Sequence, residues 1–158
     1  LSSSNLTTLS RFKTKLLKVY YLDKDDKEER ACQVLETYLE DKKIIIINTH
    51  LCHFSEDRRL YIVHKVLKFL DNITYDMVLF CGDLNSKPTS KVLKVLSEYG
   101  FDSQNTKITH ERGEIIDYIL YKTDLKVKVN SEIAFKEYSD HYCLVSSFEF
   151  WLRIYFET

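Results

Sequence analysis

The chain has 158 residues, 44% of them hydrophobic and 30% charged, which suits one globular domain with a hydrophobic core of its own. The formal net charge is −1, so the chain lacks the overall positive field of proteins that bind long duplexes without sequence preference. No apolar stretch approaches the roughly 20 residues that a membrane-spanning helix requires, and we expect no transmembrane segment.

The cysteines and the first residues bear on where the protein works. Four cysteines lie far apart, each in or beside an apolar run: Cys32, Cys52, Cys81 and Cys143. No C-x-x-C pair and no pair of histidines at zinc spacing accompanies them. They are therefore predicted to be reduced core residues, which favours an intracellular location. The opening Leu-Ser-Ser-Ser has neither an initiator methionine nor the hydrophobic region of a signal peptide, which predicts a fragment or a processed chain.

Alternating and β-branched runs predict strands in the first third of the chain. The expected strands are Leu6–Phe12, Leu16–Leu22, residues 30–39 and residues 42–48. The charged run from Asp23 to Arg30 is interpreted as a solvated turn. A second charged connection, residues 40–43, would join the last two strands as a hairpin.

Two helices are expected in the middle of the chain. The first begins at the N-cap Ser55 and runs to about Asn72, because apolar residues recur there at steps of three and four. The second opens at residues 88–90 and is closed by Gly100. A polar loop is expected at residues 102–114. The remaining strands are expected at residues 76–80, 115–121, 126–129 and 144–150, and a packed aromatic tail at residues 151–156.

Polar side chains stand at the ends of four of these strands. Their motifs are Asn48-Thr49-His50-Leu51, Gly82-Asp83-Leu84-Asn85, Ile116-Asp117-Tyr118-Ile119 and Ser139-Asp140-His141-Tyr142. Asp83 and Asn85 are two residues apart, so both point out of the same edge of a sheet. The alternative interpretation of that pair is an Asx turn that closes the strand. Asp117 lies among apolar neighbours and needs a partner, for which a cationic His50 is expected.

The four motifs, in this order, resemble the endonuclease/exonuclease/phosphatase superfamily, whose fold is like that of deoxyribonuclease I. The resemblance runs from about Leu9 to about Phe150. It implies an α+β fold, a four-layer α/β/β/α sandwich, with residues 1–158 forming a single domain. The first expected strand is similar to one near the middle of superfamily domains. The resemblance therefore implies that part of the N-terminal half, with its metal-binding glutamate, is absent.

The resemblance also implies roles for the residues of the four motifs. His141 would be the general base or the partner that orients the attacking water, with Asp83 fixing its tautomer or sharing that water. Asp140, with Asp83 and Asn85, would hold Mg²⁺ or Mn²⁺, which prefer oxygen ligands. Asn85 would also donate a hydrogen bond to a non-bridging phosphate oxygen or help to hold the nucleophile. A cationic His50, paired with Asp117, would stabilise the pentacovalent charge.

The expected activity is metal-dependent hydrolysis of a phosphodiester in nucleic acid. The candidate substrate contacts are Arg58, His110 and Arg112, and a plain surface loop is the preferred interpretation of the segment that carries His110 and Arg112. A phospholipid headgroup, as in neutral sphingomyelinases, is the alternative substrate. The alternative of another class is a non-catalytic half-domain that binds a partner or pairs with its missing half. Uncovered sheet edges would favour such association, including self-association. Because the glutamate is expected to be absent, this chain alone is expected to bind Mg²⁺ weakly and to turn over poorly.

Overall fold

The computed structural model describes residues 2–3, 6–21 and 30–150 of the chain. The elements are β1 (Ser2–Ser3), β2 (Leu6–Thr7), β3 (Thr14–Tyr21), β4 (Ala31–Leu39), β5 (Lys42–His50), α1 (Glu56–Leu70), β6 (Met77–Asp83), α2 (Lys91–Glu98), β7 (Asp117–Thr123), β8 (Val127–Phe135) and β9 (Cys143–Phe150). The expected charged turn at residues 23–30, apart from Arg30, and the expected aromatic tail lie outside the described residues.

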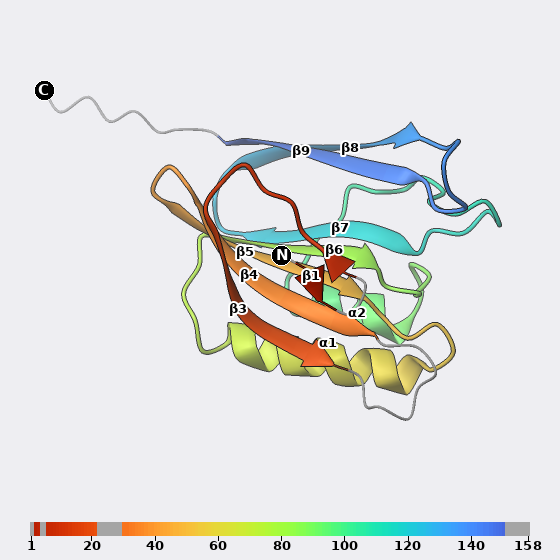
Figure 1. Ribbon diagram of the computed structural model, residues 1–158, viewed down its shortest axis with the longest axis horizontal. Helices are drawn as coiled ribbons and strands as arrows, with labels where there is room; N and C mark the ends of the chain where they lie inside the picture. Colours follow the sequence, from red (N-terminus) through yellow and green to blue (C-terminus); the bar gives the residue numbers. More distant parts are fainter. Residues whose placement is uncertain (1, 4–5, 22–29, 151–158) are drawn as a thin grey trace, which may run out of the picture.

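Five strands form a mixed sheet in the order β3-β4-β5-β6-β7. β5 and β6 are parallel, and the other neighbours are antiparallel. A parallel pair needs a crossover connection, and α1 supplies it (Figure 1). The hairpin of β4 and β5 confirms the pairing predicted from the charged connection, which turns at Glu40 with a φ of 55°.

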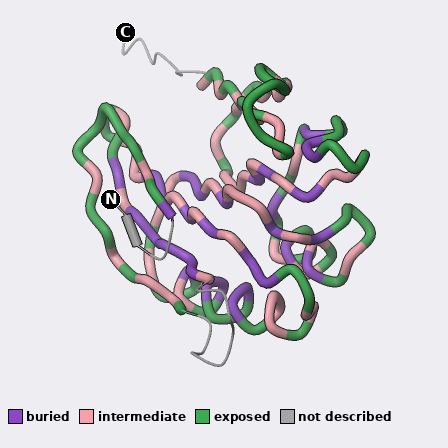
Figure 2. The backbone as a smooth tube through the Cα atoms, turned by 45° about the vertical axis from the view of Figure 1, so that its right-hand side comes forward, coloured by how far each residue is buried: buried purple, intermediate pink, exposed green. Residues whose placement is uncertain are grey.

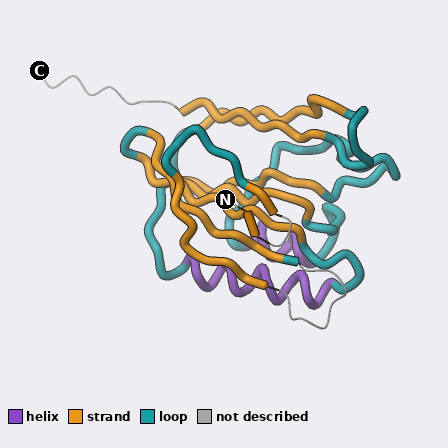
Figure 3. The backbone as a smooth tube through the Cα atoms, viewed as in Figure 1, coloured by secondary structure: helices purple, strands orange, loops and turns teal. Residues whose placement is uncertain are grey.

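The layers and the mixed sheet confirm the predicted α+β fold class. Both helices lie on one face of the five-stranded sheet, and the β8–β9 hairpin lies across the other face (Figure 3). The described residues thus supply an α layer and two β layers of the predicted α/β/β/α sandwich. None of the helices in the described part of the chain is long and apolar enough to cross a membrane.

Residues that alternate along the strands build the core between the sheet and the helices. Ile45 and Ile47 of β5 and Phe80 of β6 are fully buried against Val63 and Val66 of α1. Burying a side chain of this size contributes about 1.5–3 kcal/mol. Figure 2 shows these buried stretches running through the central strands and the inner sides of the helices. The core therefore fixes which residues of β5 and β6 face away from the helices.

Both helices begin and end at the predicted signals. The Ser55 hydroxyl accepts the backbone N–H of Arg58 at the start of α1, and the Ser90 hydroxyl accepts that of Leu93 at the start of α2. Gly100 follows α2 with a φ of 102°, the left-handed conformation that ends a helix. These contacts fix where α1 and α2 begin and where α2 ends, in agreement with the helix limits predicted from the apolar spacing.

The strand predicted over Leu6–Phe12 is wrong beyond Thr7, where β2 ends. Side-chain hydrogen bonds contact the segment that follows: the Thr8 hydroxyl donates to Gln33, and the Asn48 amide donates to Thr8. Leu9 is 90% exposed, so no apolar face anchors a longer strand there.

Two smaller predictions are also corrected. Cys143, the first residue of β9, is exposed rather than part of the core, while Cys32 and Cys52 are buried as expected. The strand predicted at residues 126–129 continues to Phe135, because every second residue from Val127 to Ile133 is partly covered. All four cysteines are free thiols.

Candidate active site

Three of the predicted site residues form a row across neighbouring strands. The parallel register pairs His50 of β5 with Asp83 of β6, and the antiparallel register pairs Asp83 with Asp117 of β7. Val78 and Phe80 of β6 face the helices, so Asp83, an odd number of residues away, faces the β8–β9 layer. The three side chains therefore share one face at one edge of the sheet, as the strand ends predicted.

His50 contacts Asp83 and Arg30. Its Nε2 lies 3.1 Å from Asp83 Oδ2. Arg30 Nη1 lies 2.6 Å from Nδ1 and 2.5 Å from Nε2 of the same ring. The expected pairing of a cationic His50 with Asp117 is therefore corrected: the carboxylate beside His50 is Asp83, and the fixed cation beside it is Arg30.

Asp83 and Asn85 form the predicted edge pair and an Asx turn at once. The Asn85 backbone N–H donates to Asp83 Oδ1 at 2.7 Å, which defines the turn. Its side-chain amide donates to Asp83 Oδ2 at 3.1 Å and to the Leu51 carbonyl at 2.9 Å. The φ of Asn85 is 45°, a conformation that Asn tolerates better than most residues. These bonds fix the direction of the Asp83 carboxylate.

His141 and Asp117 form a dyad. The Nδ1 of His141 lies 3.0 Å from each carboxylate oxygen of Asp117, so the ring donates through Nδ1 and its Nε2 is directed elsewhere. That Nε2 lies 4.0 Å from Asp83 Oδ2. The proximity of Asp83 and His141 agrees with the prediction, but Asp117, not Asp83, fixes the tautomer.

The charges around His141 change its protonation. Burial lowers the pKa of His141, but the hydrogen bond and charge of Asp117, together with the charges of Asp83 and Asp140, outweigh burial and raise the pKa above its ordinary value. The ring therefore holds its proton to a higher pH than a free histidine does. A hydrogen bond from the Ser139 hydroxyl lowers the pKa of Asp140, which keeps that carboxylate charged.

Asp117→Asn should lower the pKa of His141, because the amide keeps the shape of the carboxylate but removes the charge that favours the imidazolium. The ring of the variant should lose its proton at a lower pH than the wild-type ring. NMR titration of the His141 ring C–H signals, without divalent cations, measures the shift. The signals of His64, on the exposed face of α1, serve as the internal reference. An unchanged or raised pKa would contradict the dyad.

Asp140 lies at the same site but not against Asn85. The Asp140 side chain is 56% exposed, with Oδ2 3.5 Å from His110 Nε2. Among the described residues, Asn85 contacts Asp83 and Leu51 directly, and a cation shared by Asn85 and Asp140 stays a prediction. The two residues belong to one cluster through Asp83 and His141.

The three predicted substrate contacts lie in different environments. Arg58, in the first turn of α1, is half-buried with its guanidinium carbon 5.6 Å from the centre of the Phe54 ring. Arg112 is exposed in the loop of residues 102–114. His110 is 5% exposed and faces Asp140 and His141. The prediction of a surface contact for His110 is therefore corrected, because the loop folds inward there.

The donor set fits a hard divalent cation. Asp83, Asp117 and His141 each offer a ligand atom, and these atoms lie within 4.8 Å of one another. The carboxylates of Asp83, Asp117 and Asp140 lie beside the imidazole rings of His110 and His141. The cluster therefore has more carboxylate groups than nitrogen ligands. Carboxylate-rich clusters of this kind suit Mg²⁺ or Mn²⁺ better than softer ions.

Sequence reasoning missed two residues of the site. Arg30 directly precedes β4, and the β4–β5 register, which pairs Cys32 with Thr49, brings it next to His50. Thr109 is fully buried, and its hydroxyl accepts the backbone N–H groups of Ile116 and Asp117. A hairpin register worked out from the sequence could have indicated Arg30. No local pattern indicates Thr109, because its partners follow the loop turn.

Solved structures of similar fold share this architecture. The human Nocturnin catalytic domain with bound sulfate anion is 21% identical, with a TM-score of 0.63, over 87% of this chain and 60% of that one. A mannosyl-6-phosphatase of Bacteroides thetaiotaomicron is 16% identical, with a TM-score of 0.65, over 87% of this chain and 68% of that one. An endonuclease/exonuclease/phosphatase of Bacteroides vulgatus is 18% identical, with a TM-score of 0.69, over 87% of this chain and 67% of that one. At these identities the likeness shows the fold alone.

The family comparison covers most of the chain. No curated protein matches the sequence. The chain spans 60% to 68% of the lengths of the three solved structures above. The family model described as endonuclease/exonuclease/phosphatase matches residues 2–141, which include all four motifs of the site except for the residue after His141. The chain is a member of the endonuclease/exonuclease/phosphatase family.

Proposed function

We propose that the site hydrolyses a phosphodiester of nucleic acid with the help of a divalent cation. The observation that carries the proposal is the row His50, Asp83 and Asp117, capped by His141 from the opposite layer. Phosphodiester hydrolysis needs a proton acceptor, positive charge at the phosphoryl oxygens and an oriented water. The row and His141 place groups for these tasks within one cluster.

His141 acts as the general base. Asp117 holds Nδ1–H, so the lone pair of Nε2 is the one that can accept a proton. The 4.0 Å between Nε2 and Asp83 Oδ2 is longer than a direct hydrogen bond and suits a water that contacts both groups. The raised pKa of His141 strengthens the ring as a base near neutral pH.

Asp140 and Asp83, with the Asn85 side chain, would hold the cation. When bound, Mg²⁺ or Mn²⁺ would supply Lewis-acid stabilisation of the charge that develops on the phosphoryl oxygens. Arg30 and His50 lie at the other end of the row, where a guanidinium and an imidazole donor can bind a non-bridging oxygen. The proposal thus gives the cationic role expected of His50 alone to His50 and Arg30 together.

Two cation–aromatic pairs near the site support nucleic acid as the substrate. Arg58 lies over Phe54, in the connection that follows His50, and Lys136 Nζ lies 5.1 Å from the centre of the Tyr142 ring, next to His141. Rings that stack on bases next to cations that contact phosphates are the usual parts of a surface for unpaired strands. One pair stands on the β5 side and the other on the β9 side.

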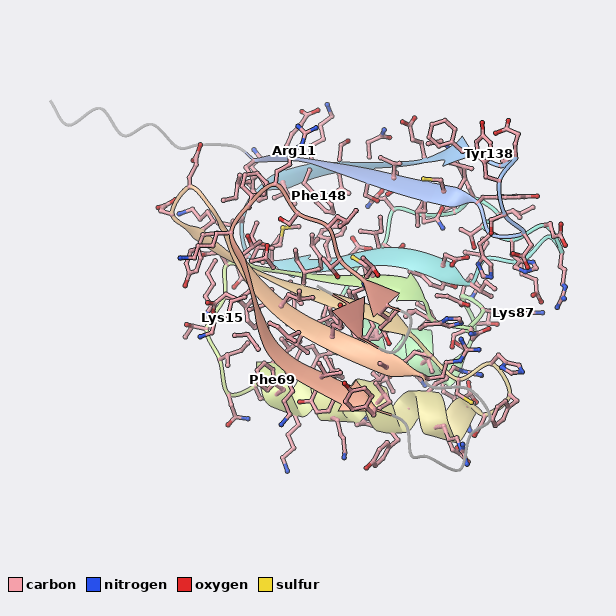
Figure 4. All side chains as sticks on the ribbon, viewed as in Figure 1. Arg11, Lys15, Phe69, Lys87, Tyr138 and Phe148 are labelled. Carbon is pink, nitrogen blue, oxygen red and sulfur yellow. The ribbon has the colours of Figure 1, made fainter. Side chains whose placement is uncertain are left out.

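A phospholipid headgroup is the second candidate, and one observation favours it. Phe135, the last residue of β8, is 56% exposed, and Tyr138, between β8 and His141, is 89% exposed. With Tyr142 and Cys143 they line a hollow of about 220 Å³ that reaches His141. Figure 4 shows Tyr138 projecting from the end of the β8–β9 layer. Exposed rings beside an active site can contact a lipid surface as well as a base.

A panel of labelled substrates tests the proposal. The protein, in excess over substrate because slow turnover is expected, would be incubated with single-stranded RNA, single- and double-stranded DNA, and sphingomyelin vesicles, with and without Mg²⁺ or Mn²⁺. We expect cation-dependent cleavage of at least one nucleic acid and none of sphingomyelin. Cleavage of sphingomyelin alone would establish the second candidate. Cleavage that persists in EDTA would contradict the cation's role.

A further inference from the structure

His110 is a buried histidine that the proposed reaction does not use. It stands at the inner end of the loop of residues 102–114, 5% exposed, with its ring edge-on to that of His141 at a centroid distance of 4.7 Å. Its Nδ1 accepts the backbone N–H of Arg112 at 3.1 Å, and its Nε2 lies 3.5 Å from Asp140 Oδ2. Every polar atom of the ring thus has a neighbour.

The contact with Arg112 decides which nitrogen of His110 carries the proton. A backbone N–H can only donate, so Nδ1 must present its lone pair, and the proton of the ring sits on Nε2. That N–H is directed at Asp140 Oδ2, at a distance slightly longer than an ordinary hydrogen bond. The tight turn that follows, in which Gly113 N–H donates to the His110 carbonyl, keeps the Arg112 N–H in place.

Backbone bonds hold the same two segments together on both sides of His110. Glu111 N–H donates to the Asp140 carbonyl at 2.9 Å, and Tyr142 N–H donates to the Thr109 carbonyl at 2.7 Å. His110 and His141 are partners in the β-bridge between them. The segment that carries Asp140 and His141 is therefore docked onto the loop, not only onto β9.

We propose that His110 is a positioning residue: its Nε2–H orients the Asp140 carboxylate, and the ring itself does not bind the cation. This inference rests on the proposed function, because it is that proposal which assigns Asp140 to the cation. His110, Asp140 and His141 do lie close enough for three ligand atoms to meet. However, a nitrogen that carries a proton has no lone pair for a metal, so the Nε2 of His110 serves Asp140 instead. Partners that orient metal-binding side chains typically change metal affinity 10- to 100-fold when they are replaced.

The tautomer can be measured without any activity. Long-range ¹H–¹⁵N correlation of the imidazoles should show a proton on Nε2 and none on Nδ1 of His110. Adding Mg²⁺, which is diamagnetic and does not broaden the signals, should leave that proton in place. A proton on Nδ1, or loss of the Nε2 proton on adding Mg²⁺, would overturn the proposal.

Two variants separate the turn from the contact with Asp140. His110→Asn can still accept the Arg112 N–H, as an ordinary Asx turn, but its amide is too short to reach Asp140. His110→Gln can reach Asp140 with its amide N–H. Mn²⁺ binding, followed by electron paramagnetic resonance, should weaken about 10-fold in His110→Asn and stay within about threefold of wild type in His110→Gln. Equal affinity in His110→Asn and wild type, or equal losses in both variants, would overturn the proposal.

Asp140→Asn keeps this test distinct from a test of the proposed function. If Asp140 binds the cation, Mn²⁺ affinity should fall in Asp140→Asn, and adding His110→Asn to it should cause little further loss. If Asp140→Asn binds Mn²⁺ as wild type does, the proposed cation site fails. The tautomer of His110 then still decides whether the ring contacts Asp140 as described. Thermal unfolding of each variant identifies losses that come from misfolding.

Discussion

Asp83→Ala should lower the rate of phosphodiester cleavage by about 10²- to 10⁴-fold, the range for removing a group that assists proton transfer. The expected loss is large because this one carboxylate contacts His50 and Asn85 and lies 4.0 Å from His141 Nε2. Removing it deprives the cluster of a cation ligand and of the acceptor that orients His50. Single-turnover cleavage of the nucleic acid identified in the substrate panel measures the effect.

Two controls make the result specific. Asp83→Asn keeps an acceptor for the Asn85 N–H, so it should fold normally and still lose most of the activity. Asp124→Ala removes an exposed carboxylate at the opposite end of β7 and should cleave as wild type does. A rate for Asp83→Ala within a few-fold of that for Asp124→Ala would show that the row is not the reaction centre.

Gly82→Ala should destabilise the fold by about 3–5 kcal/mol, well above the loss caused by most substitutions. A Cβ at this position would lie 1.9 Å from the Thr49 carbonyl oxygen, and the φ of 125° is one that residues with a Cβ rarely adopt. Relieving the clash would push β6 away from β5 at the point where Asp83 meets His50. Urea unfolding followed by circular dichroism measures the loss of unfolding free energy.

Gly113→Ala is the matched control for Gly82→Ala. The φ of Gly113 is 81°, also left-handed, but nothing lies within 4 Å of the position that its Cβ would take. The free energy of unfolding of Gly113→Ala should therefore fall only by the cost of the strained backbone, about 1–3 kcal/mol. Equal losses in the two variants would mean that contact with β5 is not what requires glycine at residue 82.

The sequence located the strand ends because each motif adjoins an apolar or β-branched run that forms a strand: two motifs close β5 and β6, one opens β7 and one precedes β9. Ile45 and Ile47 face the helices, so His50 had to face the other layer, and the same parity applies to Asp83. Apolar spacing and caps likewise placed both helices within a few residues of their true ends. These features depend on residues close together in the chain, which a sequence displays directly.

The sequence does not show which charged side chains of the site are neighbours. Strand ends show that His50, Asp83, Asp117 and His141 share an edge, but strand order and register decide which are neighbours. Because β6 lies between β5 and β7, Asp83 separates His50 from Asp117, and Asp117 meets His141 from the opposite layer. The partners are exchanged relative to the prediction.

The loop of residues 102–114 shows a second limit of sequence reasoning. Its polar composition predicted a surface loop, yet Thr109 and His110 are buried under the site. Their partners are the backbone of Asp117 and the Asp140 carboxylate, which come from other segments. Polar residues buried by such contacts look the same in the sequence as residues exposed to water.

Paramagnetic broadening by Mn²⁺ tests most directly whether the four motifs form one cation site. In ¹⁵N-labelled protein, small amounts of Mn²⁺ should first broaden the amide signals of residues 83–86, 117 and 139–142, and then those of residues 49–51. Signals from the C-terminal turn of α1, at the other end of β5 and β6, should stay sharp. Broadening centred on another surface, or spread evenly over the exposed carboxylates, would contradict the site.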